Sequence, residues 1–305
     1  MLDLALMIEG QNGLNWPRWQ QMARAAENLG FAGLYRSDHF TNPEGPHLDS
    51  LELWASLTWL ASNTTRIEFG PLVSPVSFRN PVVTAWTAAA VDDLSSGRLN
   101  LGLGAGWQER EHQSHGFDLL DVDHRFERFV EGIEVVKTLL ESDTPSSFDG
   151  EFYHLDDALL LPRPERPGGP PIVIGGNGPK RTLPLAAKYA REWNAVSLTP
   201  VAFAERCAIL DDLLAKEGRQ PGDVRRTMMT RVVPGENDAA AEAKVDDAPG
   251  RRSRGQLIGS PDRIVEDLGK LAEAGVQRVM AQWLDLDDID GIELLAAKVL
   301  PQLAS

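Results

Sequence analysis

A glycine-rich turn at residues 175–181 has the composition of a phosphate-binding loop. It follows an apolar run at 171–174 that predicts a strand, and Pro179 is expected to begin the next helix. Glycines let backbone N–H groups approach an anion, and the N-terminus of a helix adds partial positive charge there. An ordinary strand-to-helix turn is the alternative, because the glycine spacing is not that of a Walker P-loop. The candidate phosphate ligands are Gly175, Gly176, Asn177, Gly178 and Lys180.

A carboxylate beside a histidine, Asp38 and His39, follows a second apolar run at residues 31–36. Such a histidine can donate a hydrogen bond, stabilise an anionic ring or transfer a proton. The alternative is a structural histidine that bonds a neighbouring carbonyl group. His39 is therefore the first candidate for a catalytic residue.

Two further apolar runs end in glycine or proline with few bulky side chains, at residues 70–75 and 102–107. A pocket lined by backbone in this way would suit a flat, polar ring system. The glycines at 102–106 partly match a dinucleotide-binding fingerprint, but Trp107 stands at the position of its third glycine. No early βαβ unit precedes them, so we expect no Rossmann site.

Composition narrows the class of protein and of ligand. The formal charge of −15 opposes binding to nucleic acid, and no apolar run reaches the roughly 20 residues that cross a bilayer. The single cysteine, Cys207, excludes an internal disulfide and suits a reducing cytoplasm. Glu109, Glu111 and His112 are spaced somewhat like metal ligands, but no second histidine lies at helical spacing, and we expect no metal.

Strand and helix patterns alternate along the whole chain, which is typical of parallel βα units. Eight such strands fit a closed TIM-type (β/α)8 barrel, with residues 1–305 as one domain and the chemistry at the carboxyl ends of the strands. Residues 143–170 are expected as a proline-rich insertion, and residues 234–259 as either a mobile lid or a solvated loop. The predicted strands are residues 2–9, 31–36, 65–73, 98–103, 171–174, 192–197, 225–233 and 276–283.

Taken together, these segments resemble the bacterial luciferase-like superfamily of flavin and deazaflavin oxidoreductases. The resemblance covers nearly the whole chain. Each piece is weak alone, but their order and spacing are specific for the superfamily. The matching segments are residues 37–40, 74–81, 96–107, 125–128, 175–183 and 192–194.

The resemblance implies a barrel that holds the deazaflavin coenzyme F420 at its carboxyl end, with FMN as the alternative cofactor. The cofactor phosphate would lie in the turn at 175–181. A cis peptide bond between Pro71 and Leu72 would press on the ring, and Ser74 would hydrogen-bond it. The candidate ring-binding residues are Asp38, His39, Pro71, Leu72, Ser74, Gly104, Gly106 and Trp107.

The activity that follows is hydride transfer between F420 and a small organic substrate, with His39 as proton donor or orienter. Relatives that oxidise sugar phosphates carry a glutamate at the position of Trp107 and a tryptophan at that of Pro43, so this substrate class is disfavoured. Glu109 could instead supply a proton from nearby. A two-component FMN monooxygenase and a non-catalytic flavin-binding protein are the alternatives. A reductase that supplies the reduced cofactor and a second copy of the chain are the expected protein partners.

Overall fold

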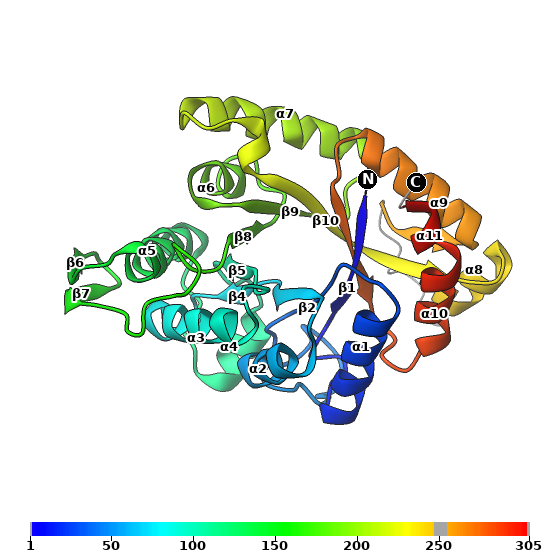
Figure 1. Ribbon diagram of the computed structural model, residues 1–305, viewed down its shortest axis with the longest axis horizontal. Coiled ribbons are helices and arrows are strands. Elements are labelled where there is room, and N and C mark those ends of the chain that lie inside the picture. The colour runs from blue at the N-terminus through cyan, green and yellow to red at the C-terminus, as the bar shows by residue number, and fades with distance from the viewer. Residues whose placement is uncertain (1, 247–254, 304–305) are drawn as a thin grey trace.

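Nine parallel strands curl into a barrel in the computed structural model, which describes residues 2–246 and 255–303 (Figure 1). Their order is β3-β2-β1-β12-β10-β9-β8-β5-β4. A bridge between Phe69 and Leu99 connects β3 to the segment before β5, so the sheet is nearly closed and the predicted TIM barrel is confirmed. The strands are β1 (Asp3–Ile8), β2 (Gly33–Arg36), β3 (Glu68–Pro71), β4 (Ser74–Pro75), β5 (Leu101–Gly104), β8 (Ile172–Gly175), β9 (Glu192–Val196), β10 (Arg225–Pro234) and β12 (Arg278–Trp283).

Helices surround the barrel, and most begin at side-chain caps that the sequence contains. The side chains of Asn15, Asn80 and Thr199 accept backbone N–H groups at the starts of three of them, two of which have proline directly after the cap. Within the described residues no helix is long and apolar enough to cross a membrane. The helices are α1 (Trp16–Asn28), α2 (Leu53–Asn63), α3 (Pro81–Leu94), α4 (Glu109–His115), α5 (Val122–Glu141), α6 (Thr182–Tyr189), α7 (Pro200–Lys216), α8 (Asp238–Asp246), α9 (Pro261–Glu273), α10 (Ile289–Lys298) and α11 (Leu300–Leu303).

The third predicted strand, 65–73, is two strands that pair with different neighbours. Backbone pairing with β2 extends to Leu72, whose N–H donates to the carbonyl of Arg36 at 2.7 Å, whereas β4 pairs with β5. The chain thus crosses from one neighbour to the other between Leu72 and Ser74. The cis peptide bond lies in this crossing, between Leu72 and Val73, so its predicted place at Pro71–Leu72 is wrong by one residue.

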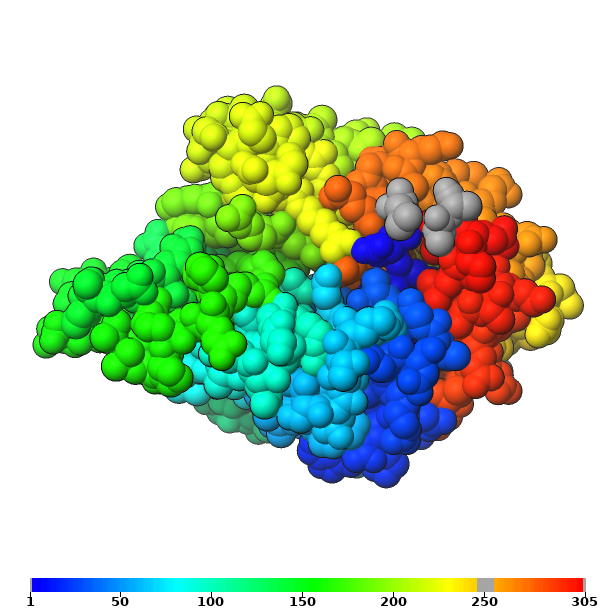
Figure 2. Space-filling model, in the orientation of Figure 1, coloured from blue at the N-terminus to red at the C-terminus, as the bar shows by residue number. Residues whose placement is uncertain are grey.

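The two predicted insertions contain regular structure. Residues 143–170 include an antiparallel hairpin of β6 (Ser146–Asp149) and β7 (His154–Ala158), which stands out from the barrel beside α5 at the left of Figures 1 and 2. Residues 234–259 include α8 and the strand β11 (Leu257–Gly259), which pairs with β10. The sequence predicts a loop over 234–259, and this prediction is wrong for the residues of α8 and β11. Residues 247–254 lie outside the described residues, so a lid there stays a prediction.

A polar cluster fills the barrel at the amino ends of the strands, away from the predicted site. Arg278 is almost fully buried, and one of its nitrogens lies 2.7 Å from both the Tyr35 hydroxyl and the Glu68 carboxylate. Burial alone would lower the pKa of Arg278, but these partners raise it, so the guanidinium stays charged. Above this cluster the interior is apolar, with Met7 and Met280 fully buried. Because these side chains fill the barrel at the amino ends of the strands, a cofactor site is expected at the carboxyl ends.

Candidate functional site

His39 follows β2 and is held by a residue from another element, Glu111 of α4. Nδ1 of His39 lies 2.9 Å from Oε1 of Glu111, and the other carboxylate oxygen accepts the N–H of Phe40 at 3.0 Å. Glu111 is only 1% exposed, so its charge acts in a poorly hydrated place. Burial alone would lower the pKa of His39, but the hydrogen bond and charge of Glu111 outweigh it and raise the pKa. No described residue bonds Nε2, which leaves that nitrogen to meet a ligand.

The carboxylate of Asp38, the neighbour of His39, already forms hydrogen bonds with other residues of the protein. Both of its oxygens accept hydrogen bonds from Arg79, at 3.0 and 2.7 Å, and Ser74 donates its hydroxyl to one of them at 3.0 Å. Arg79 also pairs with Glu52 at 2.7 Å. Asp38 and Ser74 are buried, so within the described structure their side chains brace the loop ends after β2 and β3. Their predicted contact with a cofactor ring stays a prediction.

The glycines after β5 leave room for other protein groups. A Cβ on Gly104 would lie 2.5 Å from Cγ2 of Val73, and a Cβ on Gly106 would lie 2.3 Å from the Ser77 hydroxyl. Gly106 also has a φ of +83°, which disfavours any side chain. The Ser77 hydroxyl in turn forms a hydrogen bond with Nε2 of His112 at 2.8 Å. These glycines therefore allow the loops after β3 and β5 to pack closely. A ligand at this end of the barrel would contact the backbone of these loops.

Trp107 and Glu109 lie at the rim of a hollow of about 490 Å³, together with Pro43, Gln108 and other residues of α4. The Trp107 side chain is 58% exposed, and its ring meets the His39 ring edge to face at 5.6 Å between centroids. An exposed aromatic ring beside a histidine offers a surface for a flat ligand. Glu109 is exposed, and the structure shows no bond between it and His39. Its role as a proton donor stays a prediction.

The glycine-rich turn after β8 has the features of an anion cradle. Asn177 bonds Val196 in both directions, at 2.8 and 2.9 Å, and its carbonyl accepts from Arg206 at 3.1 Å, so the turn is held from outside. Within the described residues, no acceptor is found for the backbone N–H groups of Asn177, Gly178, Lys180 and Arg181. Lys180 is exposed without a side-chain partner there. Free N–H groups beside a cation are what a phosphate requires.

The helix after this turn begins later than the sequence suggested. It starts at Thr182 rather than at Pro179. The carbonyl of Gly178 accepts the N–H of Leu183 at 3.0 Å, which makes the turn wider than a direct entry into the helix. The wider turn is the reason that several N–H groups lie outside the helix and without a partner.

Two acidic residues at this end of the barrel were not identified as site residues from the sequence. Glu111 was considered only as a metal ligand, although a period of 3.6 places it on one polar face of a helix with Gln108 and His115. Glu9 follows β1 and accepts from Gln282 at 2.6 Å. The sequence gives no comparable signal for Glu9. The described residues contain no group of three or more His, Cys, Asp or Glu side chains arranged to hold a metal ion.

Comparison with known proteins gives matches along most of the chain. A sequence model of the luciferase-like monooxygenases matches residues 6–253. An F420-dependent glucose-6-phosphate dehydrogenase of Amycolatopsis mediterranei is 36% identical over 176 residues, which cover 56% of this chain and 49% of that protein. An F420-dependent hydroxymycolic acid dehydrogenase of Mycobacterium tuberculosis is 28% identical over 264 residues, 86% of this chain and 70% of that protein. The match thus spans about half the length of the first relative.

Solved structures share the whole fold. An F420-dependent secondary alcohol dehydrogenase, in complex with an F420–acetone adduct, superimposes with a TM-score of 0.86 at 20% identity and covers 99% of both chains. The F420-dependent tetrahydromethanopterin reductase of Methanopyrus kandleri gives a TM-score of 0.81 at 20% identity, over 98% of this chain and 99% of that one. At these identities the likeness shows the fold alone.

Proposed function

Because the chain belongs to the luciferase-like monooxygenase family, we propose that it is an oxidoreductase that transfers hydride between coenzyme F420 and a small organic substrate. The F420-dependent relatives support this choice of cofactor. The single observation that carries the proposal is the pairing of His39 with buried Glu111 at the carboxyl end of β2. That pair supplies a histidine of raised pKa, with one nitrogen free, beside the exposed ring of Trp107.

The residues present fit such a cofactor. The turn at 177–181 offers backbone N–H groups without acceptors for a phosphate, with Lys180 and Arg206 as nearby cations. Leu72, Val73 and Trp107 lie at the strand ends where the ring would be held. When bound, F420 supplies a carbon that accepts or donates a hydride. The protein contributes the placement of the ring and the handling of the accompanying proton.

His39 is the residue that we assign to the proton. Glu111 bonds Nδ1, so Nε2 is the nitrogen that would give a proton to a carbonyl substrate or take one from an alcohol. The charge of Glu111 stabilises the protonated ring, and its second bond to Phe40 fixes the direction from which it acts. Glu109 is the second candidate for a proton donor, because it lines the hollow beside Trp107.

Trp107 and Pro43 bear on the class of substrate. The resemblance implies a glutamate and a tryptophan at these positions in relatives that oxidise sugar phosphates, so sugar phosphates are disfavoured as substrates of this chain. Trp107 and Pro43 both line the hollow at the rim of the site, so they would form part of the substrate surface. The exposed side chains of Val83, Trp86 and Leu94 on α3 support a homodimer, and the single cysteine suits a cytoplasmic enzyme. An enzyme that consumes reduced cofactor would also need a reductase to regenerate it.

Titration of the purified protein with F420 and with FMN, followed by fluorescence quenching, tests the proposal. We expect micromolar or tighter binding of F420 and much weaker binding of FMN. The reverse order would favour the FMN monooxygenase, and no binding of either would overturn the cofactor assignment. Turnover is then followed by F420 absorbance with a panel of alcohols and carbonyl compounds. His39→Ala should keep the F420 affinity and lose roughly 10²–10⁴-fold in rate; an unchanged rate would contradict the role of His39.

A further inference from the structure

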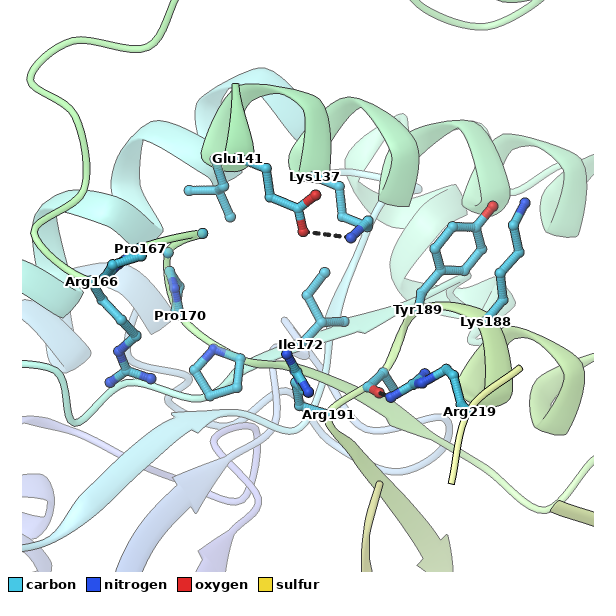
Figure 3. A pocket seen from close by; sticks show the side chains of 15 residues that line it. Lys137, Glu141, Arg166, Pro167, Pro170, Ile172, Lys188, Tyr189, Arg191 and Arg219 are labelled. Carbon is cyan, nitrogen blue, oxygen red and sulfur yellow. Dashed lines mark hydrogen bonds and ion pairs between the residues drawn. The ribbon is translucent and has the colours of Figure 1, made fainter. Parts of the chain in front are cut away.

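A second hollow, of about 400 Å³, lies at the opposite end of the barrel from His39. It is lined by residues that precede β8 and β9, at the amino ends of these strands, and by the last turns of α5 and α6 (Figure 3). The site of the proposed reaction lies at the carboxyl ends. The two hollows are therefore separate, and nothing in the proposed chemistry uses the second one.

Positive charge dominates the lining. Five cationic side chains line it and Glu141 is its one carboxylate, in a chain whose formal charge is −15. Figure 3 shows Lys137 and Glu141 on α5 over the hollow, with Arg191 and Arg219 beneath it. The cationic residues are Lys137, Arg166, Lys188, Arg191 and Arg219.

Three of these cations have acidic partners. Lys137 pairs with Glu141 on the same helix, and Arg166 pairs with buried Asp92 at 3.1 Å. Lys188 is 3.5 Å from Glu134, a weak and largely exposed contact. These ion pairs neutralise much of the charge of the three residues. The guanidinium groups of Arg191 and Arg219 are the two that form no ion pair among the described residues.

Arg191 and Arg219 have no carboxylate partner among the described residues. Arg219 donates to the backbone carbonyls of Ala187, Ala190 and Asp223 at 2.6, 2.7 and 3.2 Å, which satisfies N–H groups but brings no net charge. The side chain of Arg191 is exposed and forms no hydrogen bond or ion pair there. Burial is the main cause of the lowered pKa of Arg219; the charge of nearby Asp223 opposes it, and the charge of Arg191 lowers the pKa further. Arg191 and Arg219 therefore repel each other, although Asp223 and Glu217 reduce the excess of positive charge at Arg219.

The C-termini of two helices offset only part of the positive charge in the hollow. α5 and α6 both end at the hollow, and each C-terminus carries roughly half a negative charge. Together they offset about one of the two guanidinium charges, and the carboxylates of Asp223 and Glu217 act mainly on Arg219, which leaves Arg191 as the group without a compensating charge. An anion that bound here would remove the remaining repulsion, and Arg191 could meet it without losing a bond that it already makes.

The rest of the lining is apolar and stiff. Pro167 and Pro170 lie on one side of the hollow and the Tyr189 ring on the other, with Ile172 between them (Figure 3), and Pro171 also lines the hollow. Prolines have no N–H to offer, so their side of the hollow, the proline wall, suits the body of an organic molecule rather than a second anionic group. A volume of about 400 Å³ lies within the range of small-molecule sites.

We propose that this hollow binds a small, soluble phosphomonoester, with its phosphate at Arg191 and Arg219 and its organic part against the proline wall. Binding here is independent of the cofactor, so the proposal stands or falls separately from the proposed function. Guanidinium groups are suited to this task because their donors match two phosphate oxygens at once.

Isothermal titration of the purified protein with adenosine 5′-monophosphate, in buffer without phosphate, tests the proposal. Uncharged adenosine is the control for the organic part. We expect measurable binding of the nucleotide, no binding of adenosine, and at least a tenfold loss of nucleotide affinity in Arg191→Glu. Arg191 makes no side-chain bond within the described residues, so this variant should fold normally, which circular dichroism checks.

Two matched variants distinguish binding in this hollow from binding in the turn after β8 and from an effect of net charge. Arg24→Glu, at an exposed arginine of α1, makes the same change of net charge and should leave the affinity within twofold. Lys180→Glu changes the turn after β8 and should also leave it within twofold. A loss confined to Lys180→Glu would place the nucleotide in that turn, and an equal loss in Arg24→Glu would reduce the effect to net charge. Either result, or no binding by the unaltered protein, would overturn the proposal.

Discussion

Glu111 holds His39 across 72 residues of chain, with Oε1 2.9 Å from Nδ1 of the ring. The carboxylate is buried, so the protonated ring is stabilised by a charge that water screens only weakly. Glu111→Gln keeps the size of this side chain and removes its charge. We expect the pKa of His39 to fall and the rate to drop roughly 10- to 100-fold at neutral pH. NMR titration of the His39 ring and the pH dependence of kcat measure the two effects.

The exposed neighbour Glu109 provides the matched control. Glu109→Gln removes a carboxylate from the same short helix, α4, but the structure shows no bond between Glu109 and His39. The pKa of His39 should therefore stay where it is in this variant. A large loss of rate in Glu109→Gln with an unchanged rate in Glu111→Gln would show that the proton is supplied by Glu109 instead.

The same pair makes the stability of the protein depend on pH in a defined direction. The pKa of His39 is raised in the folded state above its ordinary value of about 6.5. The pair therefore stabilises the fold fully below that value, and the contribution is lost as pH rises through the folded-state pKa. Thermal unfolding of the unaltered protein and of Glu111→Gln should differ more at pH 6 than at pH 9. An equal difference at both pH values would contradict this linkage.

Gly104 and Val73 allow a test by double substitution. A Cβ on Gly104 would lie 2.5 Å from Cγ2 of Val73, and no other group except the Val73 Cβ lies within 4 Å. Gly104→Ala should therefore displace the loop that contains Val73 and weaken cofactor binding on the order of tenfold or more, with stability reduced by about 1–3 kcal/mol. Removing the clashing atom by Val73→Ala in the same chain should restore much of both losses. Losses that simply add in the double variant would show that the clash is not the cause.

Lys180 allows the phosphate cradle to be tested by its charge. Its side chain is exposed and has no partner among the described residues, so removing it should not affect folding. Lys180→Ala should weaken binding of F420 about tenfold, as expected for one charge-assisted contact, and make that binding less sensitive to salt. Arg24→Ala on α1 is the control at an equally exposed cation. Equal affinities in the two variants would exclude Lys180 from the cradle.

The elements of the barrel could be predicted because their signals are local. The helix α3 shows such a signal at its start, since Asn80 caps it and Pro81 is its first residue. The same rule gave the wrong start after the glycine-rich turn, where Pro179 precedes the helix by three residues. There the carbonyl of Gly178 accepts from Leu183, and a proline alone does not reveal a turn of that width.

The partners within the site could not be read from the sequence, because they come from distant segments. The sequence predicts Asp38 as a candidate ligand of the cofactor ring. Its pairing with Arg79, however, depends on how the loops after β2 and β3 meet. The bond from Glu111 to His39 likewise depends on α4 crossing toward the end of β2. Residue types and strand ends therefore indicate a candidate site, and tertiary packing decides which of its groups remain free to react.

Glu27 lies away from both sites and should anchor the start of β3. Its carboxylate accepts the backbone N–H groups of Thr65, Arg66 and Ile67 at 2.8, 3.0 and 3.1 Å. Glu27→Gln places an amide N–H₂ against one of these donors, so we expect a loss of about 1–3 kcal/mol in the free energy of unfolding. Urea denaturation measures it, and Glu44→Gln, at an exposed carboxylate, should change stability by less than about 0.5 kcal/mol.

The loss at Glu27 should also depend on pH. Burial alone would raise the pKa of Glu27, but the hydrogen bonds from Thr65, Ile67 and Arg66 outweigh it, and the pKa is lowered in the folded state. The stabilisation is therefore present above the ordinary glutamate pKa of about 4.5 and is lost as pH falls through the folded-state value. The difference between the unaltered protein and Glu27→Gln should shrink between pH 6 and pH 3. A difference that stays constant over this range would show that the charge of Glu27 does not contribute.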